Sequence, residues 1–305
     1  MPPAETVSRE SIAAGEVAKP PFAVLPDPGL RFKAHAKRFA ALAEGHELAG
    51  YLRFLAQLSE AQHLCQDGLP AAHLPPAAEL DQAYDHAMPP LPVTGFAVNA
   101  VALLTLQRIA ELLAARDLTA EALLTVETVR AMPDEARAEI LHNILSAEIP
   151  ADEIGVHVLA AAALQVHFAR MAAQLEAARL TKVAPGVCPC CGSAPVASLV
   201  VVWPKLQGHR YCCCSLCGTK WNAPRVTCVL CGSEKSVAYQ AIEGGSQAVQ
   251  AETCDECHSY VKIMAQHKDI QLDPVADDVA TLGLDVLLRD SGYRRGAANP
   301  FLLGY

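Results

Sequence analysis

The sequence predicts an α+β protein, in which an N-terminal all-α domain precedes two small four-cysteine metal modules with short β-strands. Two observations lead to this prediction. Eleven of the twelve cysteines fall between Cys188 and Cys257, and only Cys65 lies before them. The preceding residues are rich in Ala and Leu and poor in Gly and in β-branched runs, a composition that favours helices.

At 305 residues the chain can hold two or three domains. We place the helical domain at residues 1–184, with a loose proline-bearing arm up to about residue 30. The pattern changes at Pro185-Gly186, where short β-type runs begin. Residues 185–226 are therefore the first metal module, and residues 227–305 are the second module with a C-terminal helix and tail.

Helix signals recur along the first half of the chain. Thr119 is a candidate cap for a helix that precedes Pro133. Pro133 and Pro150 are each followed within three residues by a pair of acidic side chains, which predicts two further helix starts. Between residues 97 and 116 one apolar stripe follows helical spacing: Ala102, Leu106, Ile109 and Leu113.

Two stretches of the first half are less regular. Residues 70–92 contain two Pro-Pro pairs and predict a long ordered loop, which leaves about six helices for the domain. The most apolar stretch, residues 154–171, includes His157, His167 and Arg170, so it predicts a buried helix and not a membrane span. We interpret its histidines as core or rim groups.

The second half predicts strands and one terminal helix. Residues 197–203 and 237–242 each begin a few positions after a cysteine pair, and residues 260–265 form a further candidate strand. Asp277-Asp278 opens a helix that runs to Asp290. We interpret these two carboxylates as helix caps and not as an acid–base pair.

Eight cysteines form four Cys-x-x-Cys pairs that recur after forty residues, and twenty-two residues separate the two pairs of each repeat. Thiolates are soft ligands, and four of them suit one tetrahedral zinc or iron ion. We favour pairing within each repeat, while an interleaved pairing of first with third and second with fourth stays open. The candidate metal ligands are Cys188, Cys191, Cys214, Cys217, Cys228, Cys231, Cys254 and Cys257.

Three of the pairs are followed directly by glycine, and the fourth is followed by His258. A thiolate knuckle folds back through a residue with positive φ, which glycine adopts without steric cost. Each unit is also too small to be stable on an apolar core alone, so a metal ion is expected. Four thiolates leave no open position, which favours structure or electron transfer over hydrolysis. We expect His258 to lie beside the ligands and not among them.

Four thiols fall outside the repeat. We interpret Cys190, Cys212 and Cys213 as small residues packed beside the knuckles, with redox-sensitive or alternative ligands as the open alternative. Cys65 is expected to be a buried apolar residue. Five cations surround the second cysteine pair together with two tryptophans, and they form either a partner surface or an ordinary solvated face: Lys205, His209, Arg210, Lys220 and Arg225.

The net charge and the motifs limit the functional classes to which the protein can belong. The net charge of −9 and the pI of about 5.6 argue against a general nucleic-acid binder, so a tandem zinc ribbon on DNA or RNA is the weakest alternative. No nucleophile–base signature or Gly-rich phosphate loop is present, and we predict a protein that is not an enzyme. The first thirty residues contain no apolar core run of the kind that a signal peptide has. We therefore expect the protein to lie in the reducing cytoplasm, where disulfides are rare.

The residues around the cysteines resemble the FdhE family of formate dehydrogenase accessory proteins. The resemblance is dense from about residue 185 to the C-terminus and diffuse over the helical half. It rests on residues 188–196 (CPCCGSAPV), 210–217 (RYCCCSLC), 225–228 (RVTC), 251–257 (AETCDEC), 260–263 (YVKI) and 276–282 (ADDVATL).

The resemblance implies a cytoplasmic helper that is needed for active respiratory formate dehydrogenase and contacts its catalytic subunit. It also implies rubredoxin-like or zinc-ribbon-like modules that hold iron at two sites per chain, with zinc as the alternative. The four Cys-x-x-Cys pairs of the family fall on the eight cysteines named above, whereas Cys212 and Cys213 lie outside the family pattern. The alternative function is a rubredoxin-like electron-transfer or redox protein.

Overall fold

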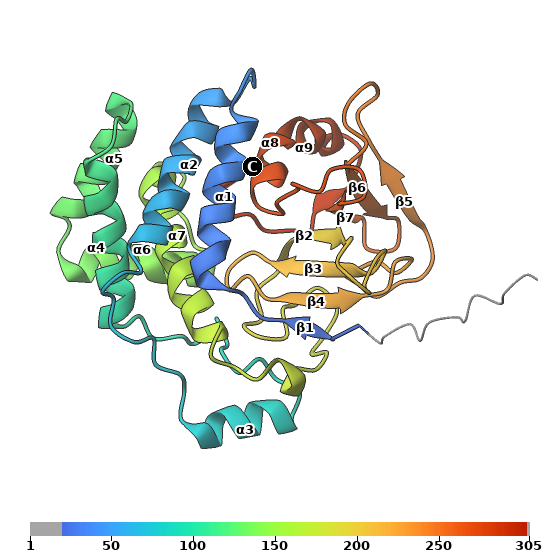
Figure 1. Cartoon of the computed structure of the whole chain (residues 1–305), viewed down its shortest axis with the longest axis horizontal. Helices are drawn as coiled ribbons and strands as arrows, with labels where there is room; N and C mark the ends of the chain where they lie inside the picture. The colour runs from blue at the N-terminus through green and yellow to red at the C-terminus, as the bar shows by residue number, and fades with distance from the viewer. Residues whose placement is uncertain (1–19, 304–305) are drawn as a thin grey trace, which may run out of the picture.

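A computed structural model describes residues 20–303, in which a group of helices packs beside one mixed β-sheet (Figure 1). The first nineteen residues of the expected N-terminal arm lie outside this part. Helix α1 (Pro28–Leu42) stands between α2 (Ala49–Leu64) and the half of the molecule that contains the sheet (Figure 1). The helical half consists of α1 (Pro28–Leu42), α2 (Ala49–Leu64), α3 (Ala77–Asp85), α4 (Ala100–Ala114), α5 (Ala120–Ala131), α6 (Asp134–Ser146), α7 (Ile154–Ala172) and the short η1 (Ala177–Arg179).

The local signals of the sequence account for several helix starts. The Thr119 hydroxyl accepts a hydrogen bond from the Ala122 amide, so the predicted cap of α5 is confirmed. Helix α6 begins at Asp134, directly after Pro133, as predicted. The helix start at Pro150 is wrong, because Pro150 accepts from the Glu153 amide in a turn and α7 begins only at Ile154.

Helix α7 is the centre of the helical core. It is the one described helix that is long and apolar enough to cross a membrane, but 83% of its apolar window is buried inside the protein. Helices α2, α4, α5 and α6 all pack against it. The predicted apolar stripe of α4 is fully buried as well. The prediction of a buried helix over residues 154–171 is therefore confirmed.

The loop predicted over residues 70–92 is partly wrong, because α3 lies within it. Pro76 is the N-cap residue of this helix, and a proline at a helix start costs no backbone hydrogen bond. Helix α3 stands apart from the other helices in Figure 1. Arg179 holds it, since its guanidinium lies over the Tyr84 ring and pairs with Asp81 at 2.8 Å.

Burial of a neutral histidine in α7 predicts a loss of stability in acid. Burial, helped by the nearby Arg170 charge, lowers the pKa of His167 to about 4. An unfolded histidine titrates near 6.5, so below that pH the unfolded chain binds a proton that the folded chain does not. Urea unfolding should show the free energy of unfolding of the wild type falling between pH 7 and 5 by about 2 kcal/mol more than that of His167→Gln.

Exposed His73 supplies the control for this prediction. His73→Gln should keep the full pH dependence of the wild type. Identical pH dependence in wild type and His167→Gln would contradict the role of His167.

The strands form a single sheet in the order β1-β4-β3-β2-β7-β6-β5, with β8 paired to β7. Strands β2 and β7 pair in parallel, and this pairing joins the two cysteine repeats into one sheet. The strands are β1 (Ala23–Val24), β2 (Pro195–Val200), β3 (Arg210–Cys214), β4 (Lys220–Ala223), β5 (Val237–Gln240), β6 (Val249–Cys254), β7 (Ser259–Ala265) and β8 (Arg294–Arg295). Strands β2, β5 and β7 lie where the sequence predicts strands.

The C-terminal helix is present but broken at Thr281 into α8 (Ala276–Ala280) and α9 (Leu282–Arg289). The Asp273 carboxylate caps α8 by accepting from the Val275 and Ala276 amides. Asp277 and Asp278 both lie in the first turn of α8, and the Asp277 carboxylate accepts from the Asp273 amide at 2.7 Å, so the interpretation as a helix cap is confirmed for Asp277 and wrong for Asp278. Both side chains are buried in ion pairs, Asp277 with Arg38 of α1 and Asp278 with Lys262 of β7.

Candidate metal centres

The first four-cysteine group lies where the sheet meets the helical half. The sulfurs of Cys188, Cys191, Cys214 and Cys217 all lie within 4.8 Å of one another. The Cys188–Cys217 and Cys191–Cys214 sulfur distances are 3.7 and 3.4 Å. Four sulfurs placed about 2.3 Å from one tetrahedral ion stand about 3.8 Å apart, so this group fits such an ion.

The second group has the same form in the second repeat. It contains Cys228, Cys231, Cys254 and Cys257. Its Cys228–Cys257 and Cys231–Cys254 sulfur distances are 3.9 and 3.8 Å. The structure thus brings the sulfurs together within each repeat and not in the interleaved arrangement. Both groups could hold a metal ion.

The backbone of each knuckle explains the residue that follows it. Gly192, Gly218 and Gly232 have φ angles of 81°, 81° and 80°, and His258 takes the same left-handed region at 49°. In the first knuckle the Gly192 amide donates to the Cys188 carbonyl at 2.9 Å, and the Cys190 amide points at the Cys188 sulfur. Positive φ after the second cysteine closes each turn, as the Cys-x-x-Cys-Gly pattern predicts.

Protonation of the first group reflects burial and mutual hydrogen bonding. Burial raises the pKa values of Cys188, Cys214 and Cys217 well above that of an ordinary thiol. Burial alone would also raise the pKa of Cys191, but hydrogen bonds from the other three thiols hold it well below its usual value. A metal ion needs all four sulfurs as thiolates, so binding releases the protons that these thiols carry.

Residues of the helical half hold both knuckles of the first group. The Leu91 and Val93 amides donate to the Cys190 and Cys191 carbonyls at 3.0 and 2.9 Å. On the second knuckle, the Gln165 amide of α7 donates to the Ser215 carbonyl at 2.8 Å. Arg31 of α1 donates to the Leu216 carbonyl at 2.9 Å. We call these four donors (Leu91, Val93, Arg31 and Gln165) the helical clasp.

Arg31 is also the end of a polar chain. Its Nε lies 3.3 Å from His35 Nε2, and His35 Nδ1 lies 2.6 Å from Asp273. Burial lowers the pKa of Arg31, while the charges of Cys217, Cys214 and Asp273 act against that shift. Four thiolates around a divalent ion leave two negative charges, and the buried Arg31 guanidinium, which interacts with the charges of Cys217 and Cys214, offsets part of them.

Gly218 leaves the space that Arg31 fills. A Cβ at this position would lie 2.5 Å from Arg31 Nη1, and the φ of +81° is strained for any other residue. Gly218→Ala should therefore cost about 1–2 kcal/mol of backbone strain and also displace Arg31 from Leu216. We expect lower thermal stability and faster metal loss from the first site.

Gly232→Ala is the matched control for Gly218→Ala. Its φ is +80°, but a Cβ there meets Pro185 only at an ordinary 3.4 Å. Equal effects of the two variants on metal retention at the respective sites would show that strain alone, and not Arg31, matters.

The two groups differ in exposure. All four cysteines of the first group are buried. In the second group Cys231 is exposed and Cys257 is partly exposed. Only the second group is therefore open to molecules from solution.

The thiols that belong to neither four-cysteine group are all buried. Cys190, Cys212 and Cys213 lie outside both four-cysteine sets. Burial raises the pKa values of Cys212 and Cys213 to about 12, and it does the same for Cys65. The Cys65, Cys212 and Cys213 thiols are therefore protonated at neutral pH, which agrees with the interpretation of packed small residues.

The cations around the second pair do not form one surface. Arg210 is fully buried, and its guanidinium pairs with Glu252 of β6 at 2.7 Å. This ion pair connects β3 of the first repeat to β6 of the second. Lys205 and Arg225 are exposed, while His209 and Lys220 are partly buried. The sequence gives no sign of the Arg210–Glu252 pair, because its two members lie 42 positions apart.

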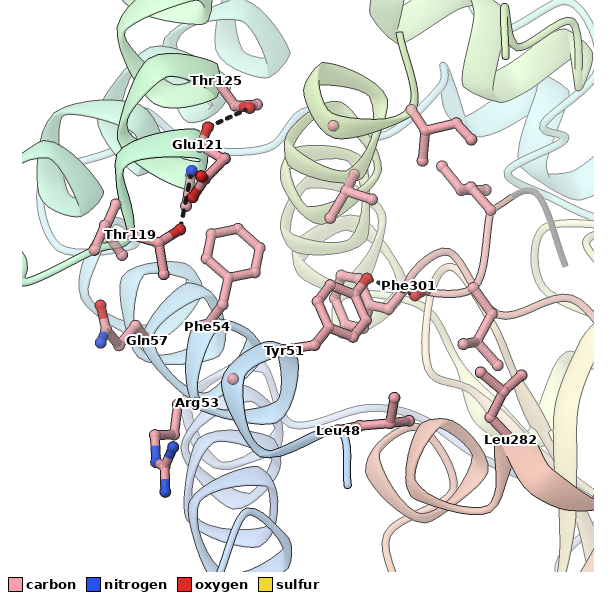
Figure 2. A pocket seen from close by; sticks show the side chains of 18 of the residues that line it. Leu48, Tyr51, Arg53, Phe54, Gln57, Thr119, Glu121, Thr125, Leu282 and Phe301 are labelled. Carbon is pink, nitrogen blue, oxygen red and sulfur yellow. Dashed lines mark hydrogen bonds between the residues drawn. The ribbon is translucent and has the colours of Figure 1, made fainter. Parts of the chain in front are cut away.

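The helical half also contains a cavity of about 800 Å³ that no sequence motif indicates (Figure 2). Its walls come from α2, α5, α7 and the C-terminal segment. The rings of Tyr51, Phe54 and Phe301 lie toward one another in Figure 2, and the Tyr51 hydroxyl donates to the Phe301 carbonyl at 2.6 Å. Thr119, Glu121 and Thr125 stand along the α5 side (Figure 2). The cavity is largely apolar, which separates it chemically from the cysteine groups.

The fold and the two groups define a class: a helical protein that carries two four-cysteine sites on a shared sheet. Three family models match consecutive parts of the chain, namely FdhE N-terminal (residues 20–185), FdhE central domain (187–225) and FdhE C-terminal domain (226–302). The chain belongs to the FdhE family, which confirms the resemblance found in the sequence.

Similar proteins support this assignment over the whole length. The Protein FdhE homolog of Rhizobium meliloti is 40% identical over 95% of this chain and 96% of its own length. The homolog of Stutzerimonas stutzeri is 33% identical over 93% of each chain. The crystal structure of the FdhE protein from Pseudomonas aeruginosa covers 93% of this chain and 99% of its own, with a TM-score of 0.82 and 29% identity.

Proposed function

We propose that this protein is an accessory factor for respiratory formate dehydrogenase, which acts without catalysing a reaction itself. In this proposal it binds the catalytic subunit of that enzyme in the cytoplasm, before export. Membership of the FdhE family, together with the two four-cysteine groups, is the observation that carries the proposal.

We further propose that the groups are rubredoxin-like sites, each holding one iron ion. Two Cys-x-x-Cys knuckles facing each other with sulfur distances near 3.8 Å support a tetrahedral metal, and iron and zinc both accept that ligand set. In either case the ion, when bound, supplies a fixed point for both knuckles. The surface over residues 188–257 that meets the partner then takes its shape from the bound metal.

Metal content and the visible spectrum of protein purified without oxygen test the identity of the metal. Two irons per chain, with a thiolate-to-iron charge-transfer band after oxidation, would support the proposed iron sites. Two zincs without a visible band would make the sites structural and would rule out redox use of the metal.

Co-purification tests the partner. The tagged chain is expressed with the formate dehydrogenase catalytic subunit from the same genome, and binding and formate-dependent dye reduction are measured. We expect the wild type to capture the subunit and to raise its activity. A chain that binds two metals but neither captures the subunit nor affects its activity would contradict the accessory function.

Electron transfer is the second candidate, and the exposed Cys231 favours it. An iron–thiolate centre exchanges electrons with a partner most easily where a ligand residue lies at the surface, and Cys231 is an exposed residue. A reversible potential and reduction by a reductase, in the absence of formate dehydrogenase, would support this candidate over the accessory function.

A further inference from the structure

We propose that the two sites divide their tasks: the second site exchanges its metal with thiol ligands from solution through Cys231, while the first site retains its metal. This inference goes beyond the proposed accessory function, because it assigns the protein a way to accept or give up a metal ion. It rests on the part of the proposed function that places a metal in each group.

The first observation is access. Cys231 is exposed, and its neighbour in the cluster, Cys257, is partly exposed, whereas the four cysteines of the first group are buried. Thiol and thiolate ligands can approach a site only from a side that protein does not cover. Among the eight candidate ligands, Cys231 is the one exposed residue, so ligand exchange begins there.

The second observation is that hydrogen bonds from the helical half hold the knuckles of the first group but not the knuckle that contains Cys231. The helical clasp holds two carbonyls of each knuckle of the first group, and α1, α7 and the segment before α4 all contribute. Opening that site requires these hydrogen bonds to break. The knuckle that contains Cys231 is contacted instead by Gly186 and Gly296, which both lie against Leu230. Within residues 20–303, helices α1–α7 make no hydrogen bond to this knuckle.

The exchange step is a ligand substitution without electron transfer. An incoming thiol loses its proton and its sulfur takes the place of Cys231, whose sulfur leaves and takes up that proton. The three ligands Cys228, Cys254 and Cys257 keep the ion in place until a second substitution follows. A small thiol, or a cysteine of a metal-carrying partner protein, has the required chemistry.

The test uses the full-length protein loaded with two zinc ions. Glutathione is added with an excess of EDTA, and native mass spectrometry follows the zinc content over time. We expect one zinc to leave at least about tenfold faster than the other. Iodoacetamide applied to the one-zinc species should then modify the second-group cysteines, with Cys231 first, as mapped by peptide mass spectrometry.

Loss of both zincs at one rate, or earlier modification of Cys188, Cys191, Cys214 or Cys217, would overturn the proposal. A chain that takes up only one zinc or none would instead remove the metal assignment on which the proposal rests. These outcomes are independent of whether the protein captures formate dehydrogenase.

Arg31→Gln tests the clasp without touching a metal ligand. The variant should speed zinc loss from the first site and leave the second-site rate unchanged. Lys33→Gln removes a charge from an exposed position of the same helix and should change neither rate. An unchanged first-site rate in Arg31→Gln would show that burial alone, and not the clasp, retains the metal.

Discussion

Cys214→Ser is expected to remove one of the two metal ions and to destroy the cooperative unfolding of the whole chain. A structural tetrathiolate site contributes about 10–16 kcal/mol, which is comparable to the total stability of a domain. Cys214 lies at the end of β3 in a fully buried group, and its loss leaves three buried thiols without a complete ligand set. Metal analysis and thermal unfolding followed by circular dichroism measure both effects.

Cys213→Ser is the matched control, because the adjacent sulfur lies outside the cluster. It buries one hydroxyl and should cost about 1–3 kcal/mol while keeping both metals. Cys231→Ser supplies a second comparison. It should also lose one metal, but the helical half and the first site should keep their unfolding transition, since that site does not depend on the exposed group.

If Cys214→Ser kept two metals and a normal transition, the first group would not be a structural metal site. If Cys231→Ser unfolded the helical half as Cys214→Ser does, the prediction that only the buried first site stabilises the helical half would be wrong. The two variants together therefore distinguish a general need for metal from a specific need for the buried site.

The sequence was most informative where the chemistry is local. A Cys-x-x-Cys-Gly knuckle needs only five consecutive residues and a positive φ, so Gly192, Gly218 and Gly232 could be interpreted without any tertiary information. The same holds for Thr119, whose cap bond spans three positions. Helix α7 was predictable because a helix that is apolar on all sides must be buried in the core, and its sequence is apolar over most of its length.

What the sequence did not predict depends on distant partners. The helical clasp joins Arg31 to Leu216 across 185 positions, and nothing local to Arg31 indicates that contact. Strand β3 has the sequence RYCCC, which contains no β-branched residue that would predict a strand. This segment is a strand because it pairs with β2 and β4. Asp277-Asp278 matched a helix start locally, but the ion pairs with Arg38 and Lys262 determine where these side chains lie.

Lys262→Met should lower the free energy of unfolding by about 3–5 kcal/mol, the second largest effect expected here. Lys262 is 1% exposed and its ammonium lies 3.1 Å from Asp278 and in contact with Asp285. It also donates to the Asp278 and Thr281 carbonyls at 2.8 and 3.1 Å. Removing the cation leaves the buried Asp278 carboxylate and the partly buried Asp285 carboxylate, which share only Arg295 as a charged partner among residues 20–303.

The expected loss of unfolding free energy comes from the carboxylates that are left without a cation, and not from the net stabilisation that the ion pair provides. A methionine has a similar length to lysine and retains most of the packing, so the lost energy measures the uncompensated carboxylates. Urea unfolding at pH 7 gives the magnitude, and exposed Lys235→Met should stay within about 0.5 kcal/mol of the wild type.

Restored stability in the double variant Lys262→Met with Asp278→Asn would identify the Asp278 charge as the cause. If the single variant were as stable as the wild type, this buried network would not hold α8 and α9 on the sheet, and the packing of Leu284 and Leu288 against Tyr260 would have to suffice.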